Sequence, residues 1–137
     1  MQVHETHRYP IRRPDDPKAW LVPDGEIGAW VAERDSEVVG HVCLTSSDGA
    51  RELLMVQRLF VEPTAGGRGV GRTLLDHVTA VARERGAQLA LEVANNNRAA
   101  INLYRRAGWL QTGRRSAPWG GDVASHVLLF NAPYRPR

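Results

Sequence analysis

Residues 59–72 read Leu-Phe-Val-Glu-Pro-Thr-Ala-Gly-Gly-Arg-Gly-Val-Gly-Arg, an apolar run that leads into a glycine-dense stretch. The apolar run predicts the end of a strand. The apolar residues that follow have helical spacing: Leu74, Leu75, Val78, Val81 and Ala82. Glycines let a backbone approach a ligand closely, and a helix start offers unpaired N–H groups. The stretch therefore predicts a phosphate-binding turn between a strand and a helix.

Two familiar nucleotide-binding patterns match this stretch less well. A Rossmann fingerprint, G-x-G-x-x-G, begun at Gly67 would place Arg72 at its third glycine. A Walker A loop, G-x-x-x-x-G-K-[ST], fits from Gly66 to Thr73 except that Arg72 replaces the lysine. A glycine-rich turn that binds nothing is the remaining alternative.

A second informative segment spans residues 91–109 and reads LEVANNNRAAINLYRRAGW. Leu89, Leu91 and Val93 alternate as in a strand, and the three asparagines that follow can cap a helix. A helical stripe then runs to a stop at Gly108 through Ala100, Leu103, Tyr104 and Ala107. This segment predicts a strand, a cap and a short helix.

The two segments together resemble the GNAT superfamily of acetyltransferases. Gly69 and Gly71 match the glycines of its pattern Q/R-x-x-G-x-G/A, whereas Gly66 departs from the usual Gln or Arg. Residues 91–109 resemble L-E-V-x-x-x-N-x-x-A-x-x-L-Y-x-x-x-G-F, with Trp109 for the final Phe. The resemblance covers about residues 27–130.

The resemblance implies acetyl-CoA as cosubstrate and no metal. The glycine loop is expected to hold the diphosphate of coenzyme A, and the backbone near Leu59 to Val61 to donate an N–H to the oxyanion of the tetrahedral intermediate. The cofactor-binding residues that it implies are Leu59, Phe60, Val61, Gly66, Gly67, Arg68, Gly69, Val70, Gly71, Arg72, Asn97 and Tyr104.

The same resemblance implies two catalytic residues. Tyr104 is expected to protonate the leaving thiolate, and Glu92 to accept a proton from the amine, as in the branch that acetylates ribosomal-protein amino termini. Each has a plainer interpretation, because Tyr104 lies on an apolar helical stripe and Glu92 is a strand residue facing away from Leu91. Other candidate bases are His41, His126, Glu52 and Glu62. Met55 occupies the place where many members carry an acid.

The predicted function is direct transfer of an acetyl group from acetyl-CoA to an amine, without a covalent enzyme intermediate. The rival hypothesis is a degenerate GNAT module that binds acyl-CoA without turnover, which the short amino end and Gly66 favour. The acceptor stays open between a peptide amino terminus, a lysine, a polyamine, an antibiotic and a small metabolite.

Outside these segments the pattern predicts an α+β fold, a mixed sheet with helices packed on it. Hairpin strands are expected over residues 27–34 and 37–45, followed by a central strand over 52–61 that is apolar on both faces. A strand over 88–94 separates the two helices, and closing strands are expected over 109–115 and 123–130.

The whole chain, residues 1–137, is predicted to be one domain with an irregular, proline-containing amino-terminal segment over residues 1–26. This segment is shorter than the strand and two helices with which GNAT domains open. We therefore expect apolar surface around Trp30 to be exposed and to promote a homodimer.

Composition indicates a soluble cytoplasmic protein, since no apolar run approaches a membrane span. The net charge of +3 comes with scattered arginines, a pattern that argues against nucleic acid as a partner. The single cysteine, Cys43, cannot form an internal disulfide and lies in an apolar stretch, so it is expected to be a buried small hydrophobe.

Overall fold

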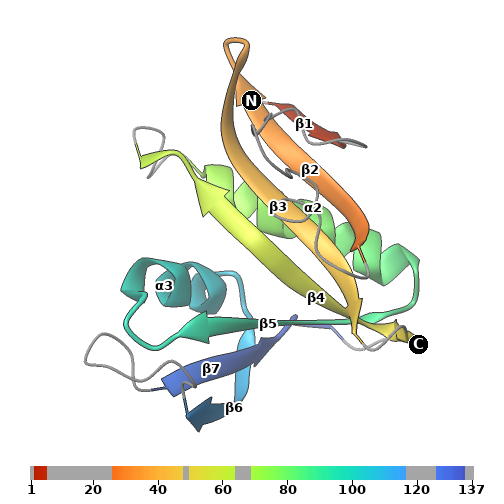
Figure 1. Ribbon diagram of the computed structural model, residues 1–137, viewed down its shortest axis with the longest axis vertical. Coiled ribbons are helices and arrows are strands. Elements are labelled where there is room, and N and C mark those ends of the chain that lie inside the picture. Colours follow the sequence, from red (N-terminus) through yellow and green to blue (C-terminus); the bar gives the residue numbers. More distant parts are fainter. Residues whose placement is uncertain (1, 6–25, 48–49, 64–68, 117–125, 135–137) are drawn as a thin grey trace, which may run out of the picture.

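The computed structural model describes residues 2–5, 26–47, 50–63, 69–116 and 126–134 (Figure 1). Their elements, in chain order, are β1 (Gln2–Glu5), β2 (Glu26–Arg34), β3 (Glu37–Ser47), β4 (Ala50–Val61), α2 (Val70–Glu84), β5 (Gln88–Ala94), α3 (Arg98–Arg106), β6 (Leu110–Ser116) and β7 (His126–Asn131). The strands and helices predicted from residue 27 onward are all present, with ends shifted by a few residues. Residues 123–125, predicted to begin the last strand, lie outside the described residues.

The strands form one seven-stranded sheet in the order β1-β2-β3-β4-β5-β7-β6. Only the β4–β5 pair is parallel, while the other neighbours are antiparallel. This mixed sheet confirms the predicted α+β class. β4 is the middle strand of the sheet, as its two apolar faces predicted.

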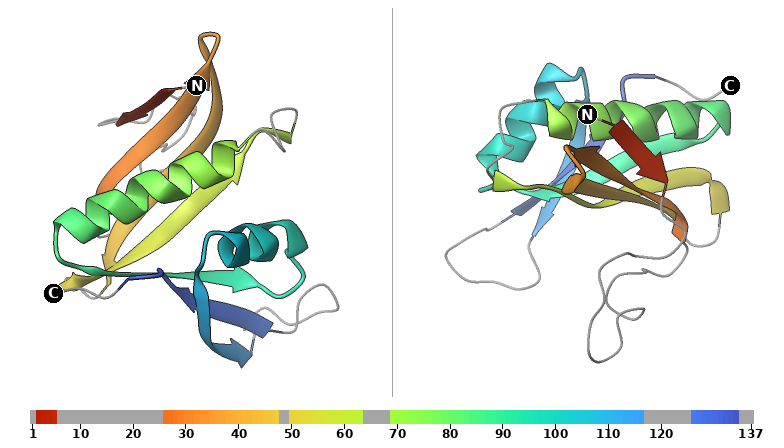
Figure 2. Two further views of the ribbon diagram at one scale, coloured as in Figure 1. Left: turned by 180° about the vertical axis from the view of Figure 1, so that it is seen from behind. Right: turned by 90° about the horizontal axis from the view of Figure 1, so that it is seen from above.

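Helix α2 covers one face of β2, β3 and β4 (Figure 2). Its buried residues, spaced as the sequence predicted, are Val70, Leu74, Leu75, Val78 and Ala82. The packing is close at Gly40 of β3, where an added Cβ would lie 2.8 Å from Leu74 and 2.9 Å from Val70. A side chain at this position would therefore displace the Leu74 and Val70 side chains of α2.

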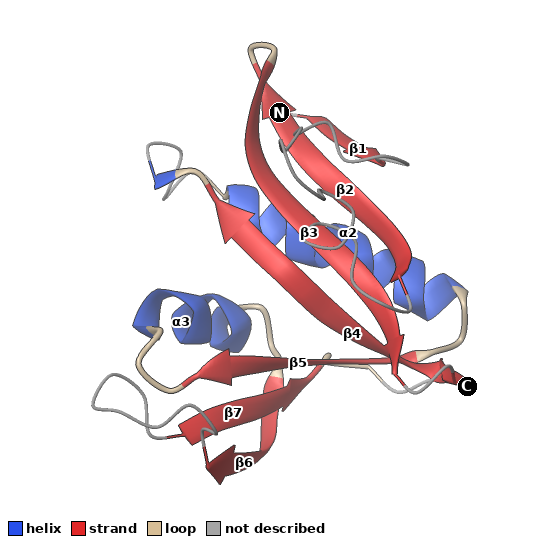
Figure 3. Cartoon of the chain, in the orientation of Figure 1, coloured by secondary structure: helices blue, strands red, loops and turns tan. Residues whose placement is uncertain are grey.

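The two parallel strands separate soon after they meet. β4 and β5 pair only between Leu53–Met55 and Gln88–Ala90, although both strands continue beyond this point. The ribbons then diverge as a V, with α3 beside the β5 arm and α2 behind the β4 arm (Figures 1 and 3). Among the described strands, the last residues of β4 thus have no partner on the β5 side.

Two expectations about the amino end were wrong. Residues 1–26 were predicted to be irregular, but β1 pairs with β2 over Gln2–Glu5 and Glu33–Trp30; residues 6–25 lie outside the described residues. Trp30 was expected to be exposed, yet only 6% of it is accessible, and its ring meets His77 of α2 edge-on at 5.2 Å. Trp30 shares the α2-facing side of the sheet with Val42, its partner in β3, and α2 therefore covers it. The homodimer stays a prediction, although the exposed apolar surface around Trp30 on which it rested is absent among the described residues.

Cys43 is fully buried, as predicted. Within the described residues, neither helix is long and apolar enough to cross a membrane.

Candidate active site

A cleft of about 660 Å³ opens where β4 and β5 separate. Three elements line it: the end of β4, the start of α2 and one side of α3. Both helices lie on the same side of the sheet (Figure 2). The two sequence segments predicted to act together, residues 59–72 and 91–109, therefore meet at one cavity.

The start of α2 presents backbone N–H groups to this cleft. Gly69 is the residue before the helix and has a φ of 78°, in the left-handed region that favours glycine. Among the described residues no side chain caps the helix at this end, and its first turn contains no acidic residue. The first-turn amides and the positive end of the helix dipole are therefore available to an anion.

Gly71 lets three elements of the site approach one another. An added Cβ would lie 3.1 Å from the side chain of Leu103 in α3 and 3.5 Å from that of Val61 in β4. This spacing holds the start of α2 against both walls of the cleft.

Helix α3 begins at the predicted cap. The Asn97 side-chain oxygen accepts a hydrogen bond from the Ala100 N–H at 3.2 Å. The cap fixes the first turn of α3, and Asn97 itself lines the cleft. Capping and ligand binding are thus compatible at this residue, as the sequence suggested.

Tyr104 is both a core residue and a lining residue of the cleft. Only 6% of the residue is accessible, and its ring centroid lies 5.9 Å from that of Phe130 and 6.1 Å from that of Trp109. Burial raises the pKa of the Tyr104 hydroxyl to about 12. The structure describes no hydrogen bond from this hydroxyl to another described residue. It is thus a protonated donor at neutral pH that faces a cavity.

Glu92 lies outside the lining of this cleft, on the opposite face of β5. Leu91 and Val93 are buried on the α3 side, whereas Glu92 points away and pairs with Arg115 of β6 at 2.7 Å. Glu92 stands two residues beyond Ala90, the last residue of β5 that pairs with β4. The carboxylate is therefore next to the opening between the strands, on the face away from Tyr104.

A β-bulge shapes the β4 wall of the cleft. His41 of β3 pairs with Phe60 and Cys43 pairs with Gln57, so Arg58 and Leu59 together lie opposite Val42 alone. Arg58 has a φ of 52°, which is uncommon for a residue other than glycine. The bulge turns the last residues of β4 toward the cleft.

The predicted cofactor residues that the structure describes all line the cleft: Leu59, Phe60, Val61, Gly69, Val70, Gly71, Arg72, Asn97 and Tyr104. Gly66, Gly67 and Arg68 lie outside the described residues. The sequence interpretation missed four lining residues of α3: Ala99, Ala100, Leu103 and Arg106. Leu103 follows Ala99 and Ala100 by four and three positions and precedes Arg106 by three, so these residues share one face of α3, and this spacing is the signal that would have found them.

Of the alternative bases, neither histidine lines the cleft. His41 is buried, and its Nδ1 lies 3.0 Å from the Arg58 carbonyl oxygen. His126 begins β7 at the far end of the sheet, opposite Ser116. Glu62 is exposed after the end of β4. The Glu52 side chain lies outside what the structure describes. The part of the chain described holds no cluster of side chains suited to a metal ion.

The chain is similar in sequence to known acetyltransferases. The chain is 35% identical over 123 residues to streptothricin acetyltransferase of Streptomyces lavendulae, an alignment that covers 80% of this chain and 65% of that protein. It is 31% identical to the peptidyl-lysine N-acetyltransferase YjaB of Escherichia coli, covering 83% of this chain and 67% of that protein. The chain thus spans less than two thirds of the Streptomyces protein.

A solved structure shows the same fold. The GNAT family acetyltransferase from Elizabethkingia anophelis, solved with acetyl-CoA bound, superimposes with a TM-score of 0.77 at 18% identity, and the match covers 96% of each chain. The family model for the acetyltransferase (GNAT) family matches residues 2–109, which include both sequence segments and most of the sheet. The chain therefore belongs to the GNAT acetyltransferase family.

Proposed function

We propose that this protein is an N-acetyltransferase that moves the acetyl group of acetyl-CoA directly to an amine. The observation that carries the proposal is the shared cleft, in which the amides at the start of α2, the free edge of β4 and the Tyr104 hydroxyl face one cavity. Family membership and the acetyl-CoA bound to the Elizabethkingia protein support the choice of cosubstrate.

In this proposal the diphosphate of coenzyme A binds at the start of α2. The N–H groups of Val70, Gly71 and Arg72 serve as donors there, and the helix dipole favours negative charge. The loop residues Gly66, Gly67 and Arg68 belong to the same proposed cradle. A glycine at position 66 removes one side-chain contact and leaves the backbone donors in place.

The pantetheine arm then runs along β4. Beyond Met55 this strand has no partner on the β5 side, so its backbone groups can pair with the amides of an extended ligand as they would with another strand. A backbone N–H near Leu59 to Val61 would stabilise the oxyanion of the tetrahedral intermediate.

Tyr104 and Glu92 lie on opposite faces of the sheet, and each is assigned one proton transfer. The amine nitrogen attacks the thioester carbon, the carbon–sulfur bond breaks, and Tyr104 donates its proton to the departing sulfur. Glu92 accepts the proton that the amine loses. An amine that entered from the Glu92 face would meet the thioester in the opening between β4 and β5, and acid and base would then act from opposite sides.

The rival hypothesis, a module that binds acyl-CoA without turnover, is favoured by one observation. The Glu92 carboxylate is engaged by Arg115, and the amine would have to share or displace this contact. The ion pair is exposed on both sides, with accessible fractions of 36% for Glu92 and 46% for Arg115, so it costs little to open.

The experiment that separates the two hypotheses measures thiol release from acetyl-CoA over a panel of amines, together with acetyl-CoA binding. The names of the relatives suggest the panel: a streptothricin-class antibiotic and lysine peptides, with peptide amino termini and polyamines added. Amine-dependent thiol release supports the enzyme. Binding without release for any amine supports the module, and absence of binding contradicts both. A cytoplasmic location, proposed on composition alone, is part of the same hypothesis.

A further inference from the structure

We infer that His41 is a positioning residue of this site, which holds the β4 bulge and so decides what β4 presents to the cleft. His41 is a β3 residue outside the two GNAT-like segments. The inference rests on the proposed use of β4 as the cofactor-binding strand, and it adds a residue to that site.

The bulge determines the direction of every residue after it. Gln57 and Phe60 pair with Cys43 and His41, two residues that share one face of β3. In a regular strand, residues 57 and 60 would point to opposite faces, because side chains alternate. The extra residue at Arg58–Leu59 therefore places Phe60 on the face away from α2 and turns Val61 toward Gly71. Without the bulge, these two directions would be exchanged.

The backbone at the bulge needs support from its surroundings. A φ of 52° at Arg58 is strained for a residue with a Cβ, and such strain persists only where neighbouring contacts hold it. One such contact is the hydrogen bond that His41 Nδ1 donates to the Arg58 carbonyl oxygen, 3.0 Å long, from a side chain that is 6% accessible. Its loss would leave a carbonyl at the bulge without this donor.

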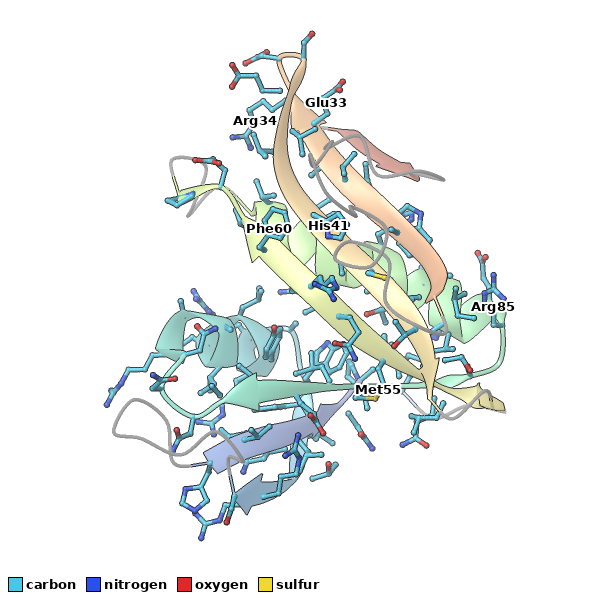
Figure 4. The ribbon with its side chains drawn as sticks, in the orientation of Figure 1. Glu33, Arg34, His41, Met55, Phe60 and Arg85 are labelled. Carbon is cyan, nitrogen blue, oxygen red and sulfur yellow. The ribbon has the colours of Figure 1, made fainter. Side chains whose placement is uncertain are left out.

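His41 also contacts the residue that the bulge redirects. Its ring stacks on Phe60 with 5.3 Å between centroids and 15° between planes. Figure 4 shows the two side chains next to each other, between β3 and β4. Phe60 is 51% accessible and lines the cleft. One imidazole thus holds both the bulge carbonyl and the aromatic residue that the bulge presents.

The geometry fixes the protonation of His41. A carbonyl oxygen can only accept, so Nδ1 must carry a proton. Nitrogen chemical shifts of isotope-labelled histidine should therefore report a protonated Nδ1 at His41. A bare Nδ1 in the folded protein would overturn the inference, and this measurement requires neither a variant nor an acceptor.

Two substitutions at His41 separate positioning from packing. His41→Leu keeps an apolar side chain and removes the donor, whereas His41→Asn keeps an amide N–H on the atom bonded to Cγ, as Nδ1 is. We expect His41→Leu to lower kcat/KM for acetyl-CoA by about 10- to 100-fold, because the β4 wall is misplaced. His41→Asn should recover most of that loss. Thr45→Val is the matched control, because Thr45 is equally buried on the same face of β3 but pairs with Met55, away from the cleft.

Equal losses in His41→Leu and His41→Asn, or a folded His41→Leu with wild-type kcat and acetyl-CoA affinity, would show that His41 is only a core residue. Failure of the proposed function has a different signature, since the wild-type protein would then bind no acetyl-CoA. In that case the amide chemical shifts of Leu59 to Val61 in His41→Leu still test the inference. They should change strongly if His41 holds the bulge, and unchanged shifts would overturn it.

Discussion

The ring centroids of Tyr104 and Phe130 lie 5.9 Å apart on the α3-covered face of the sheet. Phe130 pairs with Leu91, which precedes Glu92 in β5. Tyr104 and Glu92 are therefore separated by the thickness of the sheet at β5. If both act in catalysis, the reacting atoms must lie in the opening between β4 and β5.

Tyr104→Phe should lower kcat by a factor of about 10² to 10⁴ with little change in acetyl-CoA affinity, because it deletes the donor and keeps the packed ring. Steady-state kinetics with chemistry as the limiting step is the measurement. Tyr134→Phe is the control: its hydroxyl donates to the Ala87 carbonyl at 2.8 Å, outside the lining of the cleft. It should lower stability and leave kcat unchanged. Full activity in Tyr104→Phe would reduce Tyr104 to a core residue.

Glu92→Gln should lower activity and flatten the acidic limb of the pH–rate profile, because that limb reports protonation of the base and a glutamine amide does not titrate. Glu84→Gln, at the exposed end of α2, changes the same charge away from the site and should have no effect. If the acidic limb survives in Glu92→Gln, the base is a water molecule or another group. His126 would then be tested before His41, which is bound to the Arg58 carbonyl.

Gly69→Glu should abolish acetyl-CoA binding, because it adds bulk and negative charge where the diphosphate is proposed to bind. Gly86→Glu is a closely matched control at the other end of α2. Both glycines have positive φ, 78° and 70°, and an added Cβ meets nothing within 4 Å at either. Both variants should lose stability through the positive φ, Gly86→Glu somewhat more because its charge lies at the negative end of the helix dipole, and only Gly69→Glu should lose binding.

Thermal unfolding with and without acetyl-CoA measures this difference in binding between the two variants. A ligand at a hundredfold excess over Kd stabilises the folded state by about 2.7 kcal/mol, and the Gly86→Glu protein should show the corresponding rise in Tm. A ligand-induced rise of equal size in Gly69→Glu would contradict the proposed phosphate site.

Arg106→Gln should weaken acetyl-CoA binding by about fivefold, because the exposed guanidinium lines the cleft and the ligand is an anion. The difference should shrink at high salt, which screens exposed charges. Arg105→Gln removes the same charge from the adjacent residue, which donates to Gln111 at 3.2 Å and does not line the cleft. Titration calorimetry at two salt concentrations compares them. Equal weakening in both variants would indicate a general charge effect.

The pKa of Tyr104 predicts a loss of stability at alkaline pH. Its hydroxyl has a pKa of about 12 in the folded protein and 10.0 without burial. Between these values the unfolded chain releases the proton while the folded chain retains it, so the free energy of unfolding falls as pH rises from 10 to about 12. The shift corresponds to roughly 3 kcal/mol.

Urea unfolding across that range measures the effect, and Tyr104→Phe should flatten it. Tyr134 also has a raised pKa through burial, so Tyr134→Phe should remove a separate and smaller part of the fall. An equally steep fall in Tyr104→Phe would show that Tyr104 is not held protonated by its surroundings.

Features that depend on neighbours along the chain could be predicted from the sequence. The spacing of Leu74, Leu75 and Val78 fixed α2, Asn97 fixed the start of α3, and glycine at position 69 permitted the left-handed residue before α2. Most residues that line the cleft could also be predicted, because they lie in the segments around Gly69 and Tyr104. Each segment is a continuous stretch whose local structure sets its exposed face.

Features that depend on the register between distant segments required the folded structure. The bulge at Arg58 is defined by pairing with β3, and the His41 contact joins residues 17 positions apart. Arg115 reaches Glu92 across 23 positions because β6 and β5 both flank β7. No local pattern encodes such pairings, since a shift of one residue in either strand would exchange the faces of all its side chains. The burial of Trp30 has the same origin, because it follows from where α2 crosses β2 and not from the residues around Trp30.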